Sequence, residues 1–336
     1  MTAYAADPEL VTLLTDIFGD WQEASGSASL QVELDRGLWS TLERAGLTSL
    51  TSEDSGAGWA EAAALISIGA AHAAPVPLAE NDLLAGWLLD RAGLDRGTAI
   101  RTACLLDDAG RAAAVPWADG ADRIAVVYRR DGNTWVADVA AEDVTVERGR
   151  DIAGIPWANV RVETTRTDAV QVDEAVASLF DLRRRIARCV QISAVLQQAV
   201  RLSIRHAQER VQFGRPLAGF QAIQQLVADQ AAEAAIAQAA ADLAVAAVLA
   251  QPEEVDRLVG SVDIALSVVA HAVPVVVRAA HQVHGAIGTT AEHWLHSFTL
   301  PALAWLSELR SLRDVDLAIA GRAAGDAAGF WAWATR

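Results

Sequence analysis

Residues 210–226, RVQFGRPLAGFQAIQQL, carry side chains suited to binding an anion, in a C-terminal half otherwise rich in Ala, Leu and Val. Arg210 stands next to a predicted turn, and the planar guanidinium of an arginine can donate to two phosphate oxygens at once. Phe213 could lie against a ligand or pack in the core. We expect a long helix to end near Gln208 and another to begin after Pro216, because proline is tolerated in the first helical turn. Alone, the stretch indicates either a corner between helices or a phosphate site.

A second stretch, AAHQVHGAIGTTAEHWLH at residues 279–296, has the same character. A predicted helix ends in a glycine-containing turn and another helix follows. Gly285 and Gly288 would let backbone amides approach a ligand closely, and Thr289 or Thr290 could cap the next helix.

Several histidines of this stretch are spaced for helical neighbours. His281 with His284, and His293 with His296, stand at i, i+3, which could place two imidazoles on one metal ion. No carboxylate or thiol clearly joins either pair, so the sequence favours no metal site.

Composition restricts the class of protein. The net charge of −16, from 43 acidic and 27 basic residues, argues against a nucleic-acid or anionic-membrane surface. Cys104 and Cys189 match no disulfide or metal spacing, and no secretory signal opens the chain, so a reducing cytoplasm is expected. The Ala-rich run 231–250 is interrupted by polar residues and is typical of a packed helix, not of a membrane span.

Hydrophobic periodicity divides the 336 residues into three parts. Residues 1–97 are predicted to be helical, with Asp7 as a helix N-cap. Residues 98–168 contain short β-branched runs and a strong hairpin signal at Asp131-Gly132-Asn133, which indicates a small β domain. Residues 169–336 are helical again. The predicted fold is mainly α with a small β domain.

The two glycine-containing stretches together, in this order and at this separation, resemble the acyl-CoA dehydrogenase family. Arg-x-Gln-Phe-Gly-x-Pro-Leu followed by Phe-Gln-x-Ile-Gln is similar to the signature of that family's C-terminal domain, and Gln-x-x-Gly-x-x-Gly followed by Glu-His is similar to its second motif. LWSTLERAGLTSL, the glycine loop at 56–58 and PVPLAEN resemble the N-terminal domain. The resemblance covers nearly the whole chain. It implies an acyl-CoA dehydrogenase-like fold: an N-terminal helical domain, a β middle domain and a C-terminal four-helix bundle.

The resemblance also implies an activity and a cofactor. Such proteins hold FAD at a subunit interface and oxidise an acyl-CoA thioester to its α,β-enoyl form: a carboxylate removes the α proton while the β hydride passes to flavin N5. Their two motifs hold the adenosine and pyrophosphate half of an FAD that lies mainly in the neighbouring subunit. Carried onto this sequence, the implied FAD contacts are Arg210, Phe213, Gln282, Gly285, Ala286 and Gly288, with Gln212 and Gln221 as neighbours.

The middle domain departs from the family pattern. Where the family has a Thr-Glu-Pro…Gly-Ser-Asp segment that contacts flavin and thioester, this chain has Asp107-Asp108-Ala109-Gly110-Arg111 followed by AAAVP. A Trp-Ile-Thr-Asn strand that would cover the flavin ring is also absent. The sequence therefore predicts an incomplete flavin-ring site.

The catalytic base departs too. Many members carry a Glu-Gly-Thr segment after the second motif, whereas ALAWLSELRSL here places Glu308 near that register without Gly-Thr. Other members have the Glu on the helix before the first motif, where this chain has Arg184. Glu308 is therefore either a buried base with a raised pKa or a solvated residue at helical spacing from Arg313. The cluster Arg183, Arg184, Arg185 and Arg188 is either a solvated helix face paired with acids of a partner or a contact for CoA or FAD phosphates.

With these departures, the chain resembles the degenerate subunits of the heterotetrameric acyl-CoA dehydrogenases found in actinobacterial steroid degradation. The resemblance thus implies an α2β2 assembly with a homologous subunit, an acyl-CoA substrate, and an electron-transfer flavoprotein or similar acceptor. Two alternatives remain open: a structural or regulatory subunit without flavin, and a self-sufficient homotetramer that uses Glu308.

Overall fold

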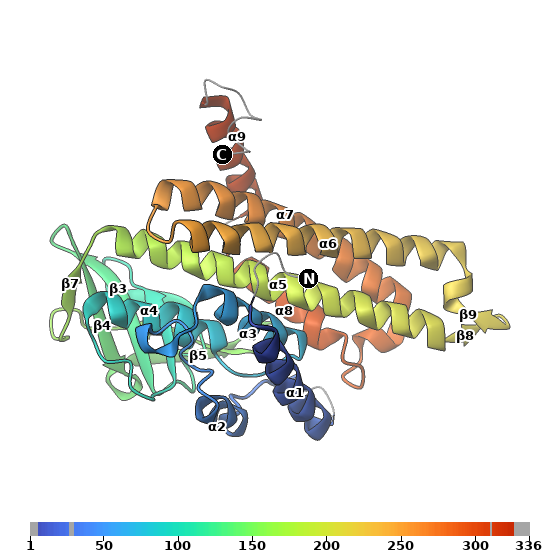
Figure 1. The fold of residues 1–336 in the computed structure, drawn as a ribbon, viewed down its shortest axis with the longest axis horizontal. Helices are drawn as coiled ribbons and strands as arrows, with labels where there is room; N and C mark the ends of the chain where they lie inside the picture. The colour runs from blue at the N-terminus through green and yellow to red at the C-terminus, as the bar shows by residue number, and fades with distance from the viewer. Residues whose placement is uncertain (1–5, 27–29, 310, 326–336) are drawn as a thin grey trace.

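The computed structural model describes residues 6–26, 30–309 and 311–325. Helices come first along the chain, strands follow, and long helices complete it (Figure 1). The prediction of a mainly α fold with a small β domain is confirmed.

The N-terminal part consists of short helices packed against one face of the bundle (Figure 1). Asp7 caps the first helix by accepting from the Glu9 amide at 2.8 Å, as predicted, and Asp35 caps the second. A stretch of π-helix precedes the last helix and places Glu80 and Asp82 in the interior. The elements are α1 (Pro8–Ser25), α2 (Arg36–Arg44), η1 (Glu53–Ser55), α3 (Trp59–Ala71), η2 (Ala79–Gly86) and α4 (Trp87–Ala92).

The middle part is formed by two small sheets with a core of their own between them. The larger has the order β1-β3-β4-β7 and the smaller β2-β6-β5; apart from the parallel pair β1–β3, the strands pair antiparallel. Asp131 and Gly132 both have positive φ and form the predicted hairpin between β3 and β4. The strands are β1 (Arg101–Leu105), β2 (Arg111–Pro116), β3 (Arg123–Arg130), β4 (Asn133–Ala140), β5 (Thr145–Arg150), β6 (Pro156–Arg161) and β7 (Val170–Val172), with a short turn η3 (Ala141–Asp143). Because β7 pairs with β4, the sheet continues past the predicted boundary at residue 168.

The C-terminal part contains three long helices that run side by side along the molecule, with two shorter ones packed against them (Figure 1). These are α5 (Ala175–Glu209), α6 (Gln221–Ala250), α7 (Val255–His284), α8 (His296–Ser307) and α9 (Leu312–Gly325). α5 is central, because it contacts α6, α7 and α8 on one side and α3 on the other. The N-terminal helices and the bundle therefore share one hydrophobic core.

The connection between α5 and α6 differs from the prediction. α5 ends at Glu209, close to the expected Gln208, but Pro216 does not open the next helix. It lies in a two-stranded hairpin, β8 (Val211–Gln212) with β9 (Arg215–Pro216), and a turn η4 (Leu217–Gly219) precedes α6. The fixed φ of proline suits an edge strand equally well, and its missing N–H removes no ladder bond there.

Two stretches, Gln221–Ala250 and Val255–Thr289, are long and apolar enough to cross a membrane by length and composition alone. In this structure they pack against each other and against α5 within the bundle. They also bury acidic side chains, among them Asp263, which pairs with Arg185 and Arg322. Their packing agrees with the sequence-based interpretation of residues 231–250 as a packed helix.

Candidate functional site

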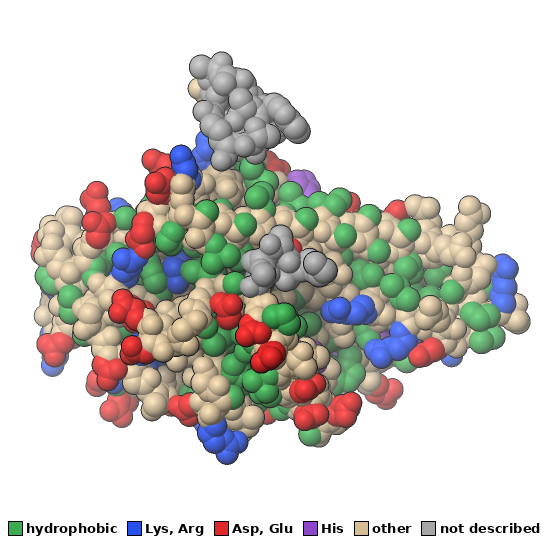
Figure 2. Space-filling view, in the orientation of Figure 1, with side chains coloured by type: hydrophobic (Ala, Val, Ile, Leu, Met, Phe, Trp, Pro, Cys, Tyr) green, Lys and Arg blue, Asp and Glu red, His purple; other side chains and the backbone are tan. Residues whose placement is uncertain are grey.

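The two glycine-containing corners lie at the same end of the bundle. The first follows the C-terminus of α5, and the second, η5 (Gly285–Thr289), follows the C-terminus of α7. His206 and His284, from the last turns of these helices, stack with ring centroids 4.6 Å apart. The hairpin β8–β9 projects beyond the helix ends (Figure 1), where basic side chains are visible at the surface (Figure 2). Residues far apart in the sequence are thus brought to one surface.

The first corner presents its side chains to solvent. Phe213 is 90% exposed and has φ +52°, a left-handed conformation that costs a non-glycine residue about 1–2 kcal/mol. Its ring meets Phe220 edge-on at 6.1 Å, and the Arg215 guanidinium lies 4.1 Å from the centroid of Phe220. Arg210, Gln212 and Gln221 are also exposed, and no described residue forms an ion pair with Arg210. An exposed aromatic ring, an available guanidinium and side-chain amides are groups that fit a nucleotide diphosphate.

The second corner offers backbone as well as side chains. Gly285 ends α7 with φ +61° and ψ −143°, and Gln282, Gly285 and Ala286 are exposed. Gly288 is different: it is buried, and a Cβ there would lie 2.9 Å from His284 Cβ and 3.0 Å from Leu295 Cδ2. Gly288 thus permits close packing beneath the corner, while the residues above it face outward.

The threonines of the second corner do not cap α8, contrary to the prediction. Thr289 Oγ1 donates to the Ala286 carbonyl at 2.8 Å and Thr290 Oγ1 to the Ile287 carbonyl at 2.9 Å. α8 begins later, at His296, and its cap position is occupied by Leu295. The hydroxyls therefore stabilise the corner itself.

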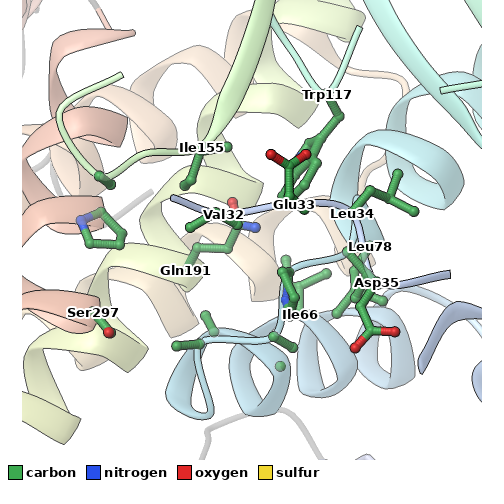
Figure 3. Close-up of a pocket in the computed structure, with 18 of the residues that line it drawn as sticks. Val32, Glu33, Leu34, Asp35, Ile66, Leu78, Trp117, Ile155, Gln191 and Ser297 are labelled. Atoms are coloured by element: carbon green, nitrogen blue, oxygen red, sulfur yellow. The ribbon is translucent and has the colours of Figure 1, made fainter. Parts of the chain in front are cut away.

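A cavity of about 500 Å³ opens where the three parts of the chain meet. Figure 3 shows side chains from all three around it: the segment Val32–Asp35 and Ile66 from the N-terminal part, Trp117 and Ile155 from the β part, and Gln191 from α5. Its wall is mostly apolar and aromatic, with Trp21, Trp294 and Trp305 completing it. A cavity of this size and character suits an organic chain.

The acidic side chains of the cavity wall are already engaged. Asp35 caps α2 and accepts from Trp21 Nε1 at 2.8 Å, and Glu33 pairs with Arg150. Among the described residues that line the cavity, no other carboxylate is present. The cavity has a binding surface but no free carboxylate on its described wall.

Glu308 lies beside the cavity in a buried ion-pair network. Arg188, whose side chain is 4% exposed, contacts Glu308 Oε2 at 2.8 Å through Nε and Glu80 Oε1 at 2.9 Å through Nη2. Burial raises the pKa of Glu308 and Arg188 opposes this; burial tends to lower the pKa of Arg188, but the two carboxylates outweigh it and raise that pKa. The expectation of a solvated Glu308 near Arg313 is wrong, because the side chain turns inward onto α5.

The remaining arginines of the α5 cluster are also satisfied within the chain. Arg183 is buried between the rings of Trp59 and Trp87, with its guanidinium carbon 4.7 and 4.5 Å from their centroids. Arg184 pairs with Asp181 at 2.8 Å, and Arg185 pairs with Asp181 and with Asp263. The interpretation as a solvated face is wrong: Arg184, Arg185 and Arg188 pair with acids of this chain, and Arg183 lies between two tryptophan rings.

The turn at residues 107–111, where the sequence departs from the family pattern, is stabilised by its own hydrogen bonds. Asp107 Oδ1 accepts from the amides of Ala109 and Arg111, at 2.9 and 2.8 Å. Gly110, with φ +72°, leaves no room for a Cβ, which would lie 2.4 Å from the Val162 carbonyl oxygen. This turn uses its hydrogen-bonding groups for its own structure.

Comparison with known proteins gives a family match for the helical bundle. Residues 176–304 match the family described as acyl-CoA dehydrogenase, C-terminal domain. Among curated protein sequences, none matches the chain. The C-terminal domain thus belongs to the acyl-CoA dehydrogenase family, and the chain as a whole has that family's fold.

Solved structures carry the same fold along nearly the whole chain. The ChsE4–ChsE5 complex from Mycobacterium tuberculosis is 22% identical, with a TM-score of 0.82 over 97% of this chain and 100% of that one. A variant of the Tcur3481–Tcur3483 steroid ACAD is 22% identical, with a TM-score of 0.79 over 94% and 98%. A glutaryl-CoA dehydrogenase from Mycobacterium smegmatis in complex with FADH2 is 12% identical, with a TM-score of 0.76 over 95% and 94%.

Sequence reasoning missed the residues that act through long-range packing. Glu80 reaches Arg188 from a π-helical stretch about a hundred positions earlier in the chain, and no local pattern signals that pairing. His206 was overlooked beside the later histidines because it stands alone in α5. The cavity wall likewise gathers residues from three distant regions.

Proposed function

We propose that this chain is a subunit of an FAD-dependent acyl-CoA dehydrogenase and contributes the adenosine and pyrophosphate half of an FAD site at a subunit interface. The observation that carries the proposal is the convergence of the two corners on one exposed end of the bundle. In an isolated chain these groups have no anionic partner among the described residues. A cofactor held mainly by a neighbouring subunit would supply one.

Each corner residue has a role that fits its chemistry. Arg210 would bind the pyrophosphate, and Gln282 with the Ala286 amide would donate to it. The Gly285 amide donates to the His281 carbonyl, so Gly285 would instead allow the ligand to approach the backbone closely. Phe213 would lie against the nucleotide, with Gln212 and Gln221 beside it. Gly288 would support the second corner from beneath. FAD, when bound, supplies the acceptor for the substrate's β hydride.

We propose that the catalytic base comes from the partner subunit. A base must be free to accept a proton at the substrate's α carbon, whereas Glu308 is held in an ion pair with Arg188. The self-closed turn at Asp107 further supports a flavin-ring site completed elsewhere. A self-sufficient enzyme using Glu308 is the less supported alternative.

A homologous partner in an α2β2 assembly is supported by the surface of α6. This helix exposes Ile236, Leu243 and Leu249, each between 46% and 53% accessible, and such apolar side chains favour burial against another subunit. Two of the similar structures are described as a complex or as a steroid ACAD, which supports a steroid-derived acyl-CoA as substrate. An electron-transfer flavoprotein or similar protein would then reoxidise the flavin in the cytoplasm.

Expression alone and with a partner tests the proposal. We expect the chain alone to be colourless, and co-expression with a homologous subunit encoded beside it to give a yellow complex that desaturates acyl-CoA. A yellow, active protein from this chain alone would favour the self-sufficient enzyme. A colourless complex with no flavin would instead support the structural-subunit alternative.

A further inference from the structure

Three histidines from separate segments converge between the two corners. His206 lies near the end of α5, His284 is the last residue of α7, and His293 lies in the loop before α8. One ring nitrogen from each lies within 4.8 Å of the others. The ring centroids are 4.6 Å apart for His206 and His284, 4.7 Å for His284 and His293, and 6.3 Å for His206 and His293.

The hydrogen bonding of His284 is that expected of a metal ligand. Its Nδ1 donates to the Ala280 carbonyl at 2.8 Å, so the lone pair is on Nε2. That Nε2 is buried without a hydrogen-bond partner, and the residue is only 5% exposed. A buried acceptor without a partner costs roughly 1–3 kcal/mol, which a bound cation would offset. Metal-binding histidines typically donate their second nitrogen to a carbonyl, as His284 does.

The other two histidines are compatible with the same ion. No hydrogen bond to a His206 ring nitrogen is formed by any described residue, while His293 Nδ1 accepts from the Leu295 amide at 3.1 Å. On metal binding, His293 would give up that amide bond. Burial lowers the pKa of all three rings, that of His284 to about 4, which leaves them neutral near pH 7. The positive charge of Arg210 near His206 opposes a cation, and Glu209 favours it.

We propose that His206, His284 and His293 bind a divalent transition-metal ion, with Zn²⁺ as the expected occupant. Imidazole nitrogens suit zinc and disfavour the oxygen-seeking Mg²⁺ and Ca²⁺. Zinc–nitrogen bonds of about 2.0–2.1 Å need ligand atoms about 3.4 Å apart in a tetrahedron, so small side-chain rotations complete the site. The fourth position is left to water.

The ion would link the end of α5 to the end of α7 and thereby hold the two corners in fixed relation. It would lie apart from the 500 Å³ cavity, because no residue of the cavity wall is among its ligands. The sequence-based prediction of no metal site rested on two local pairs, His281 with His284 and His293 with His296, whereas His206 lies far from both in the sequence. The site does not depend on FAD and can be tested without it.

Equilibrium dialysis of the purified chain, or of its complex, against Zn²⁺ followed by metal analysis tests the site. We compare the wild type with His206→Ala, which removes a half-buried ligand, and with His271→Ala, which removes an exposed histidine of α7 paired with Asp316. We expect one bound Zn²⁺ per chain in the wild type and in His271→Ala. His206→Ala should weaken binding by more than about 100-fold, because even an outer-shell partner is worth about 10–100-fold.

Two further readouts keep the test decisive. Bound Co²⁺ should give the intense visible bands of a four-coordinate site, and Zn²⁺ should raise Tm in the wild type but not in His206→Ala. If His206→Ala does not fold, His293→Gln takes its place, with circular dichroism to check its structure. Absence of bound zinc in the folded wild type, or equal zinc in wild type and ligand variant, would overturn the proposal.

Discussion

The arginines at the two ends of α5 differ in their burial and in their ion pairing. In its first half, Arg183 and Arg188 are buried and Arg185 is largely so; Arg183 lies against aromatic rings, and the other two pair with carboxylates of this chain. At its C-terminus, Arg210 is exposed and forms no ion pair with a described residue. An internally paired arginine stabilises the fold, whereas an exposed, unpaired arginine next to strained backbone is available to a ligand. The difference separates the residues that build this subunit from those it offers to another molecule.

The comparison predicts its largest effect at the buried end. Arg188→Met should lower the free energy of unfolding by about 3–5 kcal/mol, because it leaves the carboxylates of Glu80 and Glu308 buried without a counter-charge. Denaturant unfolding measures the loss, with Arg201→Ala, an exposed arginine of the same helix, as the control. A loss below about 1 kcal/mol, within the range of an exposed ion pair, would show that the network is not buried in solution.

At the exposed end, a substitution should affect FAD binding more than stability. Phe213→Gly removes an exposed ring and relieves backbone strain of about 1–2 kcal/mol, partly offset by the greater chain entropy of glycine, so stability should change by less than about 1 kcal/mol. FAD retention by the complex should nevertheless fall. Thermal unfolding and flavin absorbance of the same preparations provide the two readouts. If Phe213→Gly unfolds the protein, the ring has a structural role and the contrast between the two ends fails.

A smaller, pH-dependent effect is expected at Glu308. Burial raises its pKa in the folded state above the ordinary value near 4.5, so the folded state holds the extra proton just above that pH. Its contribution therefore makes stability decline as pH rises through this window and level off above the folded pKa. Glu308→Gln should remove the decline, which Tm measured across pH can detect.

The exposed Glu163 supplies the matched Glu→Gln control, because its side chain is 69% accessible. Activity of the Glu308→Gln complex adds a second readout: we expect it to be retained. A complex that keeps its FAD but loses desaturation would identify Glu308 as the base and contradict its assignment to the ion pair.

Local sequence signals predicted what local chemistry determines. Asp7 as a cap, the Asp131-Gly132 hairpin and the end of α5 follow from side-chain hydrogen bonds and left-handed φ values within a few residues. The placement of Pro216 was wrong because proline's fixed φ fits a helix start and an edge strand alike. A fold resemblance could name the corner residues, but not their exposure.

Long-range pairing could not be predicted from one sequence. Apart from Asp181 of α5 itself, the acids that pair with the α5 arginines come from η2, α7 and the segment after α8, and their approach depends on how distant parts of the chain pack. The same holds for His206, which meets His284 only because α5 and α7 end together. Charge clusters in a single sequence therefore do not reveal whether their partners are solvent, a ligand or the chain itself.

The FAD content of the co-expressed complex tests the central claim most directly. Arg210→Ala should weaken FAD binding by about 10- to 100-fold, the worth of hydrogen bonds to a charged group, and the purified complex should lose most of its flavin. Arg201→Ala should retain the wild-type amount. Equal flavin in wild type, Arg201→Ala and Arg210→Ala complexes would contradict the account, because the exposed corner would then play no part in holding the cofactor.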